Sequence, residues 1–503
     1  MQFLKLIMFC IAIAMCHGRG SKNPNFAPGR SVIVHLFEWK WNDIALECER
    51  FLGPKGYAGF QVSPVTENVI IPGRSWYERY QPISHKILTR SGNEQEFTDM
   101  VRRCNAVGVR TYVDVVINHM TAIHATNIGT GGSIADPFCR RYPAIGFNET
   151  HFNNPVCSIY DYNNANEVRN CELVGLRDLN HTNPFVREKT IEFLNHLIDL
   201  GVAGFRVDAA KHMWPHDLEA IYKGLKPLNT DHGFEDGALP YIVQEVIDLG
   251  GEGISCHEYT PLGAITEFRF SAHIGRVFRS HIPMHWLRSW GVGWGFVDHQ
   301  DALVFVDNHD NQRGHGAGGD TVLMYRDGKN YRMATAWALA HPYGNVRVMS
   351  SFDFQQGAND MGPPHDDHEN LLSPIINADG SCGNGWICEH RWNTTVNMVS
   401  FRIAAGDAPI LMWYDNEHSH VAFSRGNRAF IAFNREDNDF DAILNTKLPP
   451  GIYCDIISGQ RDDNRCTGTQ VVVDEQSNAR VVIPANSLTS VVAIHVGQLS
   501  KLI

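Results

Sequence analysis

The most informative segment of the chain reads 203-AGFRVDAAKHMWP-215. Its first half is an apolar run typical of a buried strand, yet it carries Arg206 and Asp208 two residues apart. Side chains at positions i and i+2 of a strand point to the same face. Charged side chains are almost never fully buried unless they are paired. We therefore expect a functional requirement for both charges at the end of this strand.

The composition is that of an ordinary water-soluble protein with more than one domain. The chain has 503 residues, which exceeds the size of a single hydrophobic core. Hydrophobic residues make up 43% and charged residues 19%, so neither a disordered nor a fibrous class fits. The formal charge of -12 repels phosphate backbones and argues against a nucleic-acid partner, whereas a neutral substrate would not sense it.

The N-terminus predicts a secreted, extracellular protein. In residues 1–18, Lys5 precedes an apolar run from Leu6 to Cys16 that is too short to span a bilayer but typical of a signal peptide. A buried N-terminal strand is the alternative interpretation. No later charge-free run is long enough to cross a membrane, so we expect no membrane partner. Glycosylation sequons occur at Asn148, Asn180 and Asn393.

Strand and helix patterns alternate along most of the chain. Amphipathic runs at 94–108 and 185–201 predict helices, the second ending at Gly201. Short β-branched runs between such helices predict a parallel sheet in an α/β protein. Polar residues recur at the strand ends, which favours a closed (β/α)8 TIM barrel over an open sheet. The expected strands include 32–37, 57–62, 110–117, 202–209, 241–246 and 302–308.

Two regions interrupt this alternation and divide the chain into domains. Residues 119–179 are rich in Asn, Gly, Pro and Cys without helical periodicity, which predicts an irregular domain inserted after the third barrel strand. Residues 415–503 change to short strands and turns, which predicts a C-terminal antiparallel β-sandwich with Greek-key-like order. The barrel then comprises residues 19–118 and 180–414.

Three carboxylates lie at the expected C-terminal ends of three strands, where barrel enzymes carry their catalytic groups. They are Asp208, Glu245 and Asp310, and Asp114 occupies a fourth strand end. Cleavage of a glycosidic bond requires a proton donor and, in retaining enzymes, a carboxylate nucleophile about 5–5.5 Å away. A third carboxylate can stabilise the positive charge of the transition state. Helix capping or ion pairing is the alternative role of each acid taken alone.

Four segments, in this order, resemble the conserved regions of the animal-type, chloride-dependent α-amylases of glycoside hydrolase family 13: 113-VDVVINHM-120, 204-GFRVDAAKH-212, 244-QEVIDLGGE-252 and 306-VDNHDNQRGHG-316. The resemblance extends over nearly the whole chain after the leader and is closest in character to arthropod digestive enzymes, such as those of mites. It implies a monomeric, secreted hydrolase of the digestive tract. The enzyme would cleave internal α-1,4-glucosidic bonds of starch and glycogen with retention, through a covalent glycosyl-enzyme.

The resemblance assigns roles to individual residues. Asp208 is the nucleophile, Glu245 the proton donor and Asp310 the transition-state stabiliser. Core packing is the alternative for the aromatic members of the substrate-binding set, and relatives usually carry a second tryptophan at the position of Tyr77. That set comprises Trp76, Tyr77, Tyr80, Gln81, His119, Lys211 and His309.

The resemblance also implies one structural calcium ion between the barrel and the inserted domain. Its ligands would be Asn118, Arg169, Asp178 and His212, which offer the hard oxygen donors that Ca²⁺ prefers. His212 would contribute its backbone carbonyl. Arg169 can likewise take part only through its carbonyl, because a guanidinium has no acceptor atom.

A chloride activator is implied as well. In the chloride-dependent branch the ligands are Arg206, Asn308 and Arg347, and two guanidiniums with one amide form an anion site. An anion beside Glu245 would disfavour its ionisation and keep it a proton donor. The alternative is that Arg206 pairs with Asp208 and keeps that carboxylate ionised, and the two interpretations are compatible.

Cysteine usage predicts a disulfide-bonded exported protein. Removal of the leader leaves ten of the twelve cysteines. For the two that remain unassigned, Cys139 and Cys256, we predict a bridge from the inserted domain to the loop after Glu245, with free thiols as the alternative. The other predicted pairs are Cys157–Cys171, Cys382–Cys388 and Cys454–Cys466 from their spacing, and Cys48–Cys104 from the resemblance.

Two other functions stay open on sequence grounds. A family relative that acts on short α-glucosides or transfers glycosyl groups would carry similar motifs, and the chain length of the products separates it from an amylase. A non-catalytic glucan-binding protein with the same fold belongs to a different class. The intact acids Asp208, Glu245 and Asp310 argue against that class.

Overall fold

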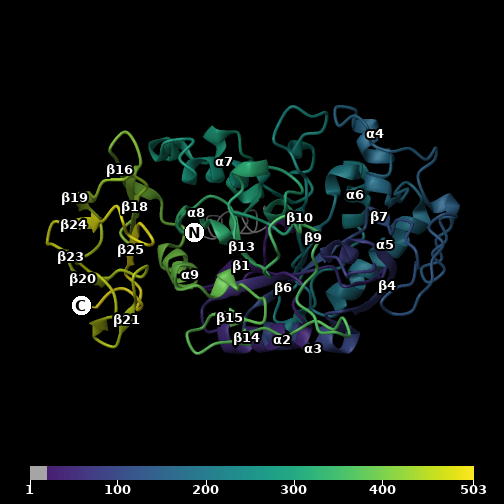
Figure 1. Ribbon diagram of the computed structural model, residues 1–503, viewed down its shortest axis with the longest axis horizontal. Helices are drawn as coiled ribbons and strands as arrows, with labels where there is room; N and C mark the ends of the chain where they lie inside the picture. The colour runs from purple at the N-terminus through teal and green to yellow at the C-terminus, as the bar shows by residue number, and fades with distance from the viewer. Residues whose placement is uncertain (1–19, 503) are drawn as a thin grey trace, which may run out of the picture.

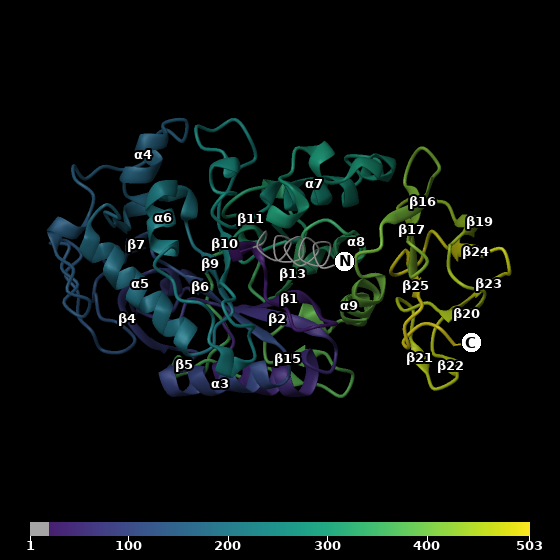
Figure 2. The ribbon, with the colours of Figure 1, turned by 180° about the vertical axis from the view of Figure 1, so that it is seen from behind.

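The computed structural model describes residues 20–502, arranged along one long axis (Figure 1). A barrel occupies the centre, the inserted segment lies at one end and the C-terminal β domain at the other. Figure 2 shows the same order from behind. The predicted leader, residues 1–18, lies outside the described residues.

Eight parallel strands close the barrel, and this confirms the predicted fold class. Closure is made by β1, which pairs with both β2 and β13. Nearly every residue of these strands is buried, as expected of a sheet enclosed by helices. Two barrel strands, β11 and β13, are not among those expected from the sequence. The strands are β1 (Ser31–Leu36), β2 (Tyr57–Val62), β6 (Arg110–Val115), β9 (Gly204–Val207), β10 (Tyr241–Gln244), β11 (Ala264–Thr266), β12 (Ala302–Val304) and β13 (Asn345–Ser350).

The helices of the barrel and the insertion include two that begin at residues well suited to that position. In α3, the side chain of Asn93 accepts from the amides of Gln95 and Glu96, while the Glu96 carboxylate accepts from the Asn93 amide. In α5, Asn183 caps a helix that starts with Pro184. The helices are α2 (Trp41–Glu47), α3 (Glu94–Ala106), α4 (Ala165–Asn170), α5 (Pro184–Asp199), α6 (Pro215–Tyr222), α7 (Phe268–Phe278), α8 (Lys329–Ala340) and α9 (Asn393–Ala405).

The inserted segment leaves and rejoins the barrel through one short antiparallel pair. β7 (His119–Met120) pairs with β8 (Arg177–Asp178), so residues at the start and the end of the segment lie side by side. Its apolar side chains form a separate core with Val69 and Ile71, which follow β3 (Thr66–Asn68), and with Ile83 of β4 (Pro82–Thr89). A short strand, β5 (Gly92–Asn93), pairs with β4. The insertion therefore leaves the barrel shortly after the end of β6 and returns to the same place.

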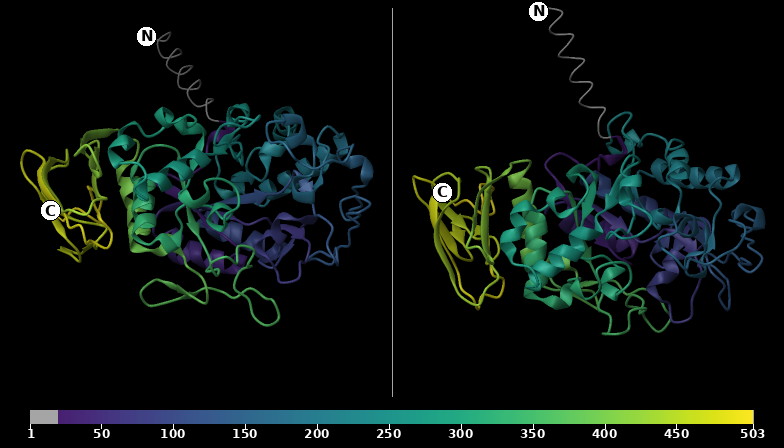
Figure 3. Two further views of the ribbon diagram at one scale, coloured as in Figure 1. Left: turned by 45° about the horizontal axis from the view of Figure 1, so that its top comes forward. Right: turned by 90° about the horizontal axis from the view of Figure 1, so that it is seen from above.

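The C-terminal domain consists of antiparallel strands with a core of their own. Its first sheet has the order β16-β17-β18-β25, and β16 begins at Ile410, before the predicted domain start at residue 415. Figure 3 shows this domain at one end of the barrel, facing α8 and α9. The strands are β16 (Ile410–Asp415), β17 (His420–Arg425), β18 (Ala429–Asn434), β19 (Phe440–Asn445), β20 (Gly451–Cys454), β21 (Arg461–Asp462), β22 (Arg465–Cys466), β23 (Gln470–Val473), β24 (Asn478–Ile483) and β25 (Val491–His495); a further hairpin, β14 (Ile375–Ile376) and β15 (Cys382–Gly383), precedes α9.

The four predicted disulfides other than Cys139–Cys256 are present. The bridges are Cys48–Cys104, Cys157–Cys171, Cys382–Cys388 and Cys454–Cys466.

The prediction of a Cys139–Cys256 bridge is wrong. Neither residue is in a disulfide. Cys139 lies in a turn of the insertion, where its amide donates to Asp136. Cys256 instead packs in the main hydrophobic core, and burial raises the pKa of its thiol to about 12.

Gly201 supports a prediction about the end of α5. Its φ is 97°, and a Cβ there would lie 2.3 Å from Nδ1 of His232. Gly132 has a φ of 79°, but a Cβ there would have nothing within 4 Å. We expect Gly201→Ala to lower the free energy of unfolding by about 2–4 kcal/mol, and Gly132→Ala by about 1 kcal/mol, because only the first adds a clash to the backbone strain. Urea denaturation of both variants tests this, and equal losses would contradict it.

Candidate active site

One arginine lies at the centre of the candidate active site. Arg206 is on β9, in register with Asp114 on the neighbouring β6. Its Nη1 donates to Asp114 Oδ1 at 2.8 Å and to Asp208 Oδ1 at 2.6 Å, and its Nη2 donates to Oε1 of Glu245. Only 3% of Arg206 is exposed. A single guanidinium therefore gathers carboxylates from three strands at one buried point.

The main chain holds Asp208 and Glu245 beside each other. Each residue follows directly after the end of its strand. The Asp208 amide donates to the Val115 carbonyl at 3.0 Å, and the Ala209 amide donates to Glu245 Oε2 at 2.8 Å. Ala209 adopts a left-handed conformation with φ of 49°, which directs its amide at that carboxylate. Because both carboxylates bind terminal nitrogens of one guanidinium, they are neighbours across a narrow space.

A tight turn after β12 presents Asp310. Asn308 Oδ1 accepts from the amides of Asp310 at 3.2 Å and Asn311 at 2.8 Å, and Asn311 Oδ1 accepts in return from the Asn308 amide. These bonds satisfy the backbone of the turn and fix its shape. His309 Nε2 lies 3.2 Å from Asp310 Oδ2. The charge of Glu245 acts on Asp310, so the third predicted acid belongs to the same cluster.

Burial gives this cluster unusual protonation properties. Burial raises the pKa of Asp208 well above its ordinary value, although the positive charge of Arg206 opposes the shift. Burial, followed by the negative charge of Glu245, raises the pKa of Asp310 to about 7. Perturbed pKa values of this kind are typical of functional sites, where acids have to exchange protons near neutral pH. The cluster is thus suited to general acid–base chemistry.

A second guanidinium lies beside the first and could hold an anion. Arg347 sits in the middle of β13, and its Nη1 donates to Gln61 Oε1 at 2.6 Å. Burial lowers the pKa of Arg347 to about 10, and the charge of Arg206 contributes to the shift. An anion between two buried like charges would relieve their repulsion. The side-chain oxygen of Asn308 accepts hydrogen bonds within the turn, and its NH₂ group stays available as a donor. All three predicted chloride ligands therefore offer donors that suit an anion.

The predicted aromatic residues form a packed wall. Tyr80 stacks on His309 with ring centroids 5.0 Å apart, and its hydroxyl donates to Asp114 Oδ2 at 3.0 Å. Trp76 meets His309 edge to face at 5.5 Å, and Tyr77 meets Trp76 in the same way at 6.0 Å. Trp76 and Tyr80 are only 5% and 8% exposed, so they offer ring edges rather than open platforms.

The remaining predicted substrate contacts divide into two kinds. His119 and Gln81 are held by the protein itself. His119 Nε2 is bonded to the Tyr80 carbonyl at 3.0 Å, and Gln81 Oε1 accepts from the Thr121 hydroxyl at 3.1 Å. Burial lowers the pKa of His119 to about 4, so its ring is neutral near pH 7.

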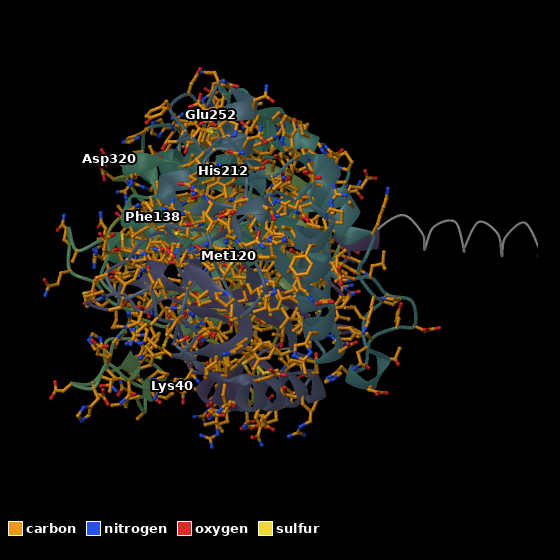
Figure 4. All side chains as sticks on the ribbon, turned by 90° about the vertical axis from the view of Figure 1, so that its right-hand side faces the viewer. Lys40, Met120, Phe138, His212, Glu252 and Asp320 are labelled. Carbon is orange, nitrogen blue, oxygen red and sulfur yellow. A yellow bond between two sulfur atoms is a disulfide. The ribbon has the colours of Figure 1, made fainter. Side chains whose placement is uncertain are left out.

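Lys211 instead links the turn after β9 to the loop after β10 and to the insertion. Its Nζ donates to the Ile247 carbonyl at 2.8 Å, pairs with Glu252 and lies 5.2 Å from the centre of the Tyr162 ring. Figure 4 shows Glu252 above His212 on the face that carries the insertion.

The predicted calcium ligands surround the base of the insertion. Asn118 Oδ1 is buried and has no hydrogen-bond partner among the described residues. Asp178 is 4% exposed, and its Oδ2 accepts only from the side-chain amide of Asn153 at 2.6 Å, without a cationic partner in residues 20–502. An orphaned carbonyl oxygen beside an uncompensated carboxylate fits a hard cation. No group of three or more His, Cys, Asp or Glu within the same residues could hold a metal, so such an ion would depend on amide and carbonyl oxygens.

The other two predicted ligands, Arg169 and His212, are joined through α4. His212 Nδ1 is bonded to the Val168 carbonyl at 3.0 Å, which joins the turn after Asp208 to α4. The Arg169 guanidinium points to Tyr259 and Glu258, so its carbonyl is the only group it could offer to an ion.

Several residues of this site were not predicted from the sequence. Asp114 was noted at a strand end but not as a partner of Arg206, although a single acid in a Val- and Ile-rich strand was a usable signal. Tyr162 and Glu252, beside Lys211, gave no such signal, because their positions depend on how the insertion folds.

In the described part of the chain, no helix combines the length and apolar character needed to cross a membrane.

Comparison with known proteins agrees with this architecture. Residues 56–232 match the model for the alpha-amylase catalytic domain, and residues 412–497 match that for the alpha-amylase C-terminal all-beta domain. Similar curated proteins include the alpha-amylase-related proteins of Drosophila auraria (53% identical) and Drosophila ananassae (52% identical), each over 98% of this chain and 99% of the relative. Among solved structures, wild-type alpha-amylase I from Eisenia fetida superposes with a TM-score of 0.90 at 44% identity, covering 94% of this chain and 98% of that one. A mutant of the same enzyme in complex with maltohexaose superposes equally well at 43% identity.

The raised pKa of Asp310 predicts how stability depends on pH. Its pKa is about 7 in the folded chain and 3.8 ordinarily, so the folded state binds more protons between these values. The destabilisation caused by Asp310 therefore grows as pH rises through this window and is complete above about pH 7. Asp310→Asn removes it, and we expect a stability gain of about 1–3 kcal/mol at pH 8 that shrinks towards pH 4.5. Thermal unfolding across this range measures the gain, and a difference independent of pH would contradict the prediction.

Proposed function

The chain belongs to the alpha-amylase family and is a glycoside hydrolase. We propose that it hydrolyses internal α-1,4 bonds of starch and glycogen with retention of configuration. The observation that carries the proposal is the adjacency of Asp208 and Glu245 on one guanidinium. Retaining glycosidases need two carboxylates close together, whereas inverting enzymes leave room for a water molecule between them.

Glu245 donates a proton to the glycosidic oxygen while Asp208 attacks the anomeric carbon from the other side. The bond to the leaving chain breaks, and a glycosyl ester forms on Asp208. Glu245 then takes a proton from water, which attacks the same carbon and releases Asp208. Asp310 stabilises the positive charge that develops on the sugar ring in both steps. His309 beside Asp310 and the edges of Trp76 and Tyr80 bound the site for this ring.

Two ions complete the proposal. Asn118 and Asp178, with the carbonyls of Arg169 and His212, would hold Ca²⁺, which would tie the insertion to the barrel. Arg206, Arg347 and the side-chain amide of Asn308 would hold Cl⁻, whose charge would favour the protonated form of Glu245.

The disulfides of the chain bear on the compartment in which it works. Four disulfides suit an oxidising extracellular compartment. We propose a secreted, monomeric digestive enzyme with a polysaccharide substrate and no nucleic-acid or membrane partner. Residues 119–179 would be the calcium-associated insertion and residues 415–503 the C-terminal domain.

Hydrolysis of soluble starch by the purified chain tests the function. We expect early products of several chain lengths, an α-anomer as the first product by proton NMR, and loss of activity in EDTA that added Ca²⁺ restores. Asp208→Asn and Glu245→Gln are each expected to lower kcat by roughly 10⁴-fold. The matched control is Asp217→Asn, which removes a buried carboxylate on α6 that pairs with Arg187. It should reduce stability and leave kcat unchanged. A β-anomeric first product would refute retention.

Arg347→Gln tests the anion site separately. Wild-type enzyme should lose activity on the basic side of its pH profile when chloride is replaced by gluconate, because Glu245 then gives up its proton more readily. We expect the variant, which lacks one of the two guanidiniums, to show the same profile in both salts. Measurement of kcat/KM against pH in each salt decides, and a wild-type chloride response in the variant would exclude Arg347 from the site.

A further inference from the structure

A buried cation lies immediately behind Asp310. Arg313 ends the turn η12 (Asn311–Arg313), and only 1% of it is exposed. Its Nη1 donates to the His309 carbonyl at 2.9 Å. Its Nε and Nη2 are buried without a hydrogen-bond partner among residues 20–502, and no carboxylate of that range lies within salt-bridge distance. This environment is unusual for a charged side chain.

Four aromatic rings enclose the guanidinium. The carbon of the guanidinium lies 4.3 Å from the ring centre of Phe354, 4.7 Å from Phe352, 5.2 Å from Phe37 and 5.7 Å from Trp76. Rings at these distances attract a cation through their negative faces. They supply part of the stabilisation that hydrogen bonds to Nε and Nη2 would otherwise give.

Packing alone does not explain the charge. Burial of a guanidinium with two unpaired nitrogens destabilises the fold, and it lowers the pKa of Arg313 to about 10. A methionine would fill a similar apolar space without that destabilisation. Groups that oppose folding in this way are typically found where function requires them.

Two contacts connect Arg313 to the proposed chemistry. The hydrogen bond to the His309 carbonyl fixes the residue that precedes Asp310. Two walls of the aromatic cage, Phe37 and Trp76, also contact the His309 ring, at 5.0 and 5.5 Å. In addition, the charge of Arg313 favours the ionised form of Asp310. The charged and titratable groups around the Asp310 carboxylate are Glu245, Arg206, Asp114, His309, Arg313 and Tyr80.

We infer that Arg313 is a positioning residue that fixes the His309–Asp310 turn and supplies the positive charge that keeps the Asp310 carboxylate ionised during catalysis. This inference depends on the proposed role of Asp310 as the stabiliser of the transition state. Arg313 acts through its neighbours and does not touch the sugar.

The test compares Arg313→Met and Arg313→Lys by kcat and KM against pH, with a chromogenic maltooligosaccharide and the full-length enzyme. Loss of the charge raises the pH at which Asp310 ionises, so the acidic limb of the Arg313→Met profile should move to higher pH. We expect kcat at neutral pH to fall by roughly ten- to hundredfold, with little change in KM. Lysine restores the charge and should return the acidic limb towards the wild-type position.

Arg402→Met is the matched control for loss of a buried arginine. The Arg402 guanidinium donates only to backbone carbonyls at the end of α8, including His341 at 2.7 Å and Gly344 at 2.7 Å. That variant should lose stability but keep the wild-type acidic limb. If Arg313→Met behaves in the same way, Arg313 is structural and the inference is overturned.

Two further variants keep the test decisive. If Arg313→Met does not fold, Phe354→Leu loosens the nearest cage wall and should move the acidic limb in the same direction by a smaller amount. An unchanged limb in that variant overturns the inference. Asp310→Asn with wild-type turnover would instead refute the proposed role of Asp310, which distinguishes failure of the proposed function from failure of the inference.

Discussion

The Arg206 guanidinium, shared by Asp114, Asp208 and Glu245, is the interaction on which the rest of the site depends. Three carboxylates this close would repel one another strongly in a buried space. One cation with fixed, planar donors holds them in a defined geometry and offsets part of that repulsion. A lysine could not do the same, because it carries one ammonium nitrogen and lacks the separate, fixed donor nitrogens with which a guanidinium binds carboxylates on different sides. Arg206 and Asp208, two charged residues in and directly after a buried strand, are thus accounted for by their ion pair.

This arrangement imposes an energetic conflict that the surrounding structure has to absorb. Asp208, Asp310 and Asp114 all have raised pKa values because burial disfavours their charge. Rigid neighbours compensate: the Tyr80 hydroxyl binds Asp114, and the Ala209 amide binds Glu245. The barrel strands under the site are almost wholly buried, so they supply the stability that the acid cluster lacks. Active sites commonly combine local instability with a stable scaffold.

The sequence was sufficient for what depends on local pattern. The strands that deliver Asp208 and Glu245 have apolar runs ending in charge, and the helix ending at Gly201 has its stop signal in the residues themselves. β11 was missed because its three residues, Ala264–Thr266, are too few to show a period. The separation of Cys139 from Cys256 and the pairing of Lys211 with Glu252 depend on how long loops fold over the barrel, and no residue pattern encodes that directly. Arg313 gave no signal either, because its environment is built from Phe37, Trp76, Phe352 and Phe354, which lie far apart in the sequence.

Barrel closure through β1 and β13 has a consequence for the way the chain folds as it is synthesised. Ile33 of β1 pairs with Arg347 of β13, so β1 cannot form this pair until the ribosome has made more than three hundred further residues. At about 5–20 residues per second, that interval is on the order of half a minute. Throughout it, one edge of β1 lacks a partner and is able to pair with another nascent chain. The Cys48–Cys104 bridge lies wholly within the early part of the chain, so it can close long before β13 emerges. It would then hold α2 against α3 and limit the freedom of the segment that carries the exposed edge.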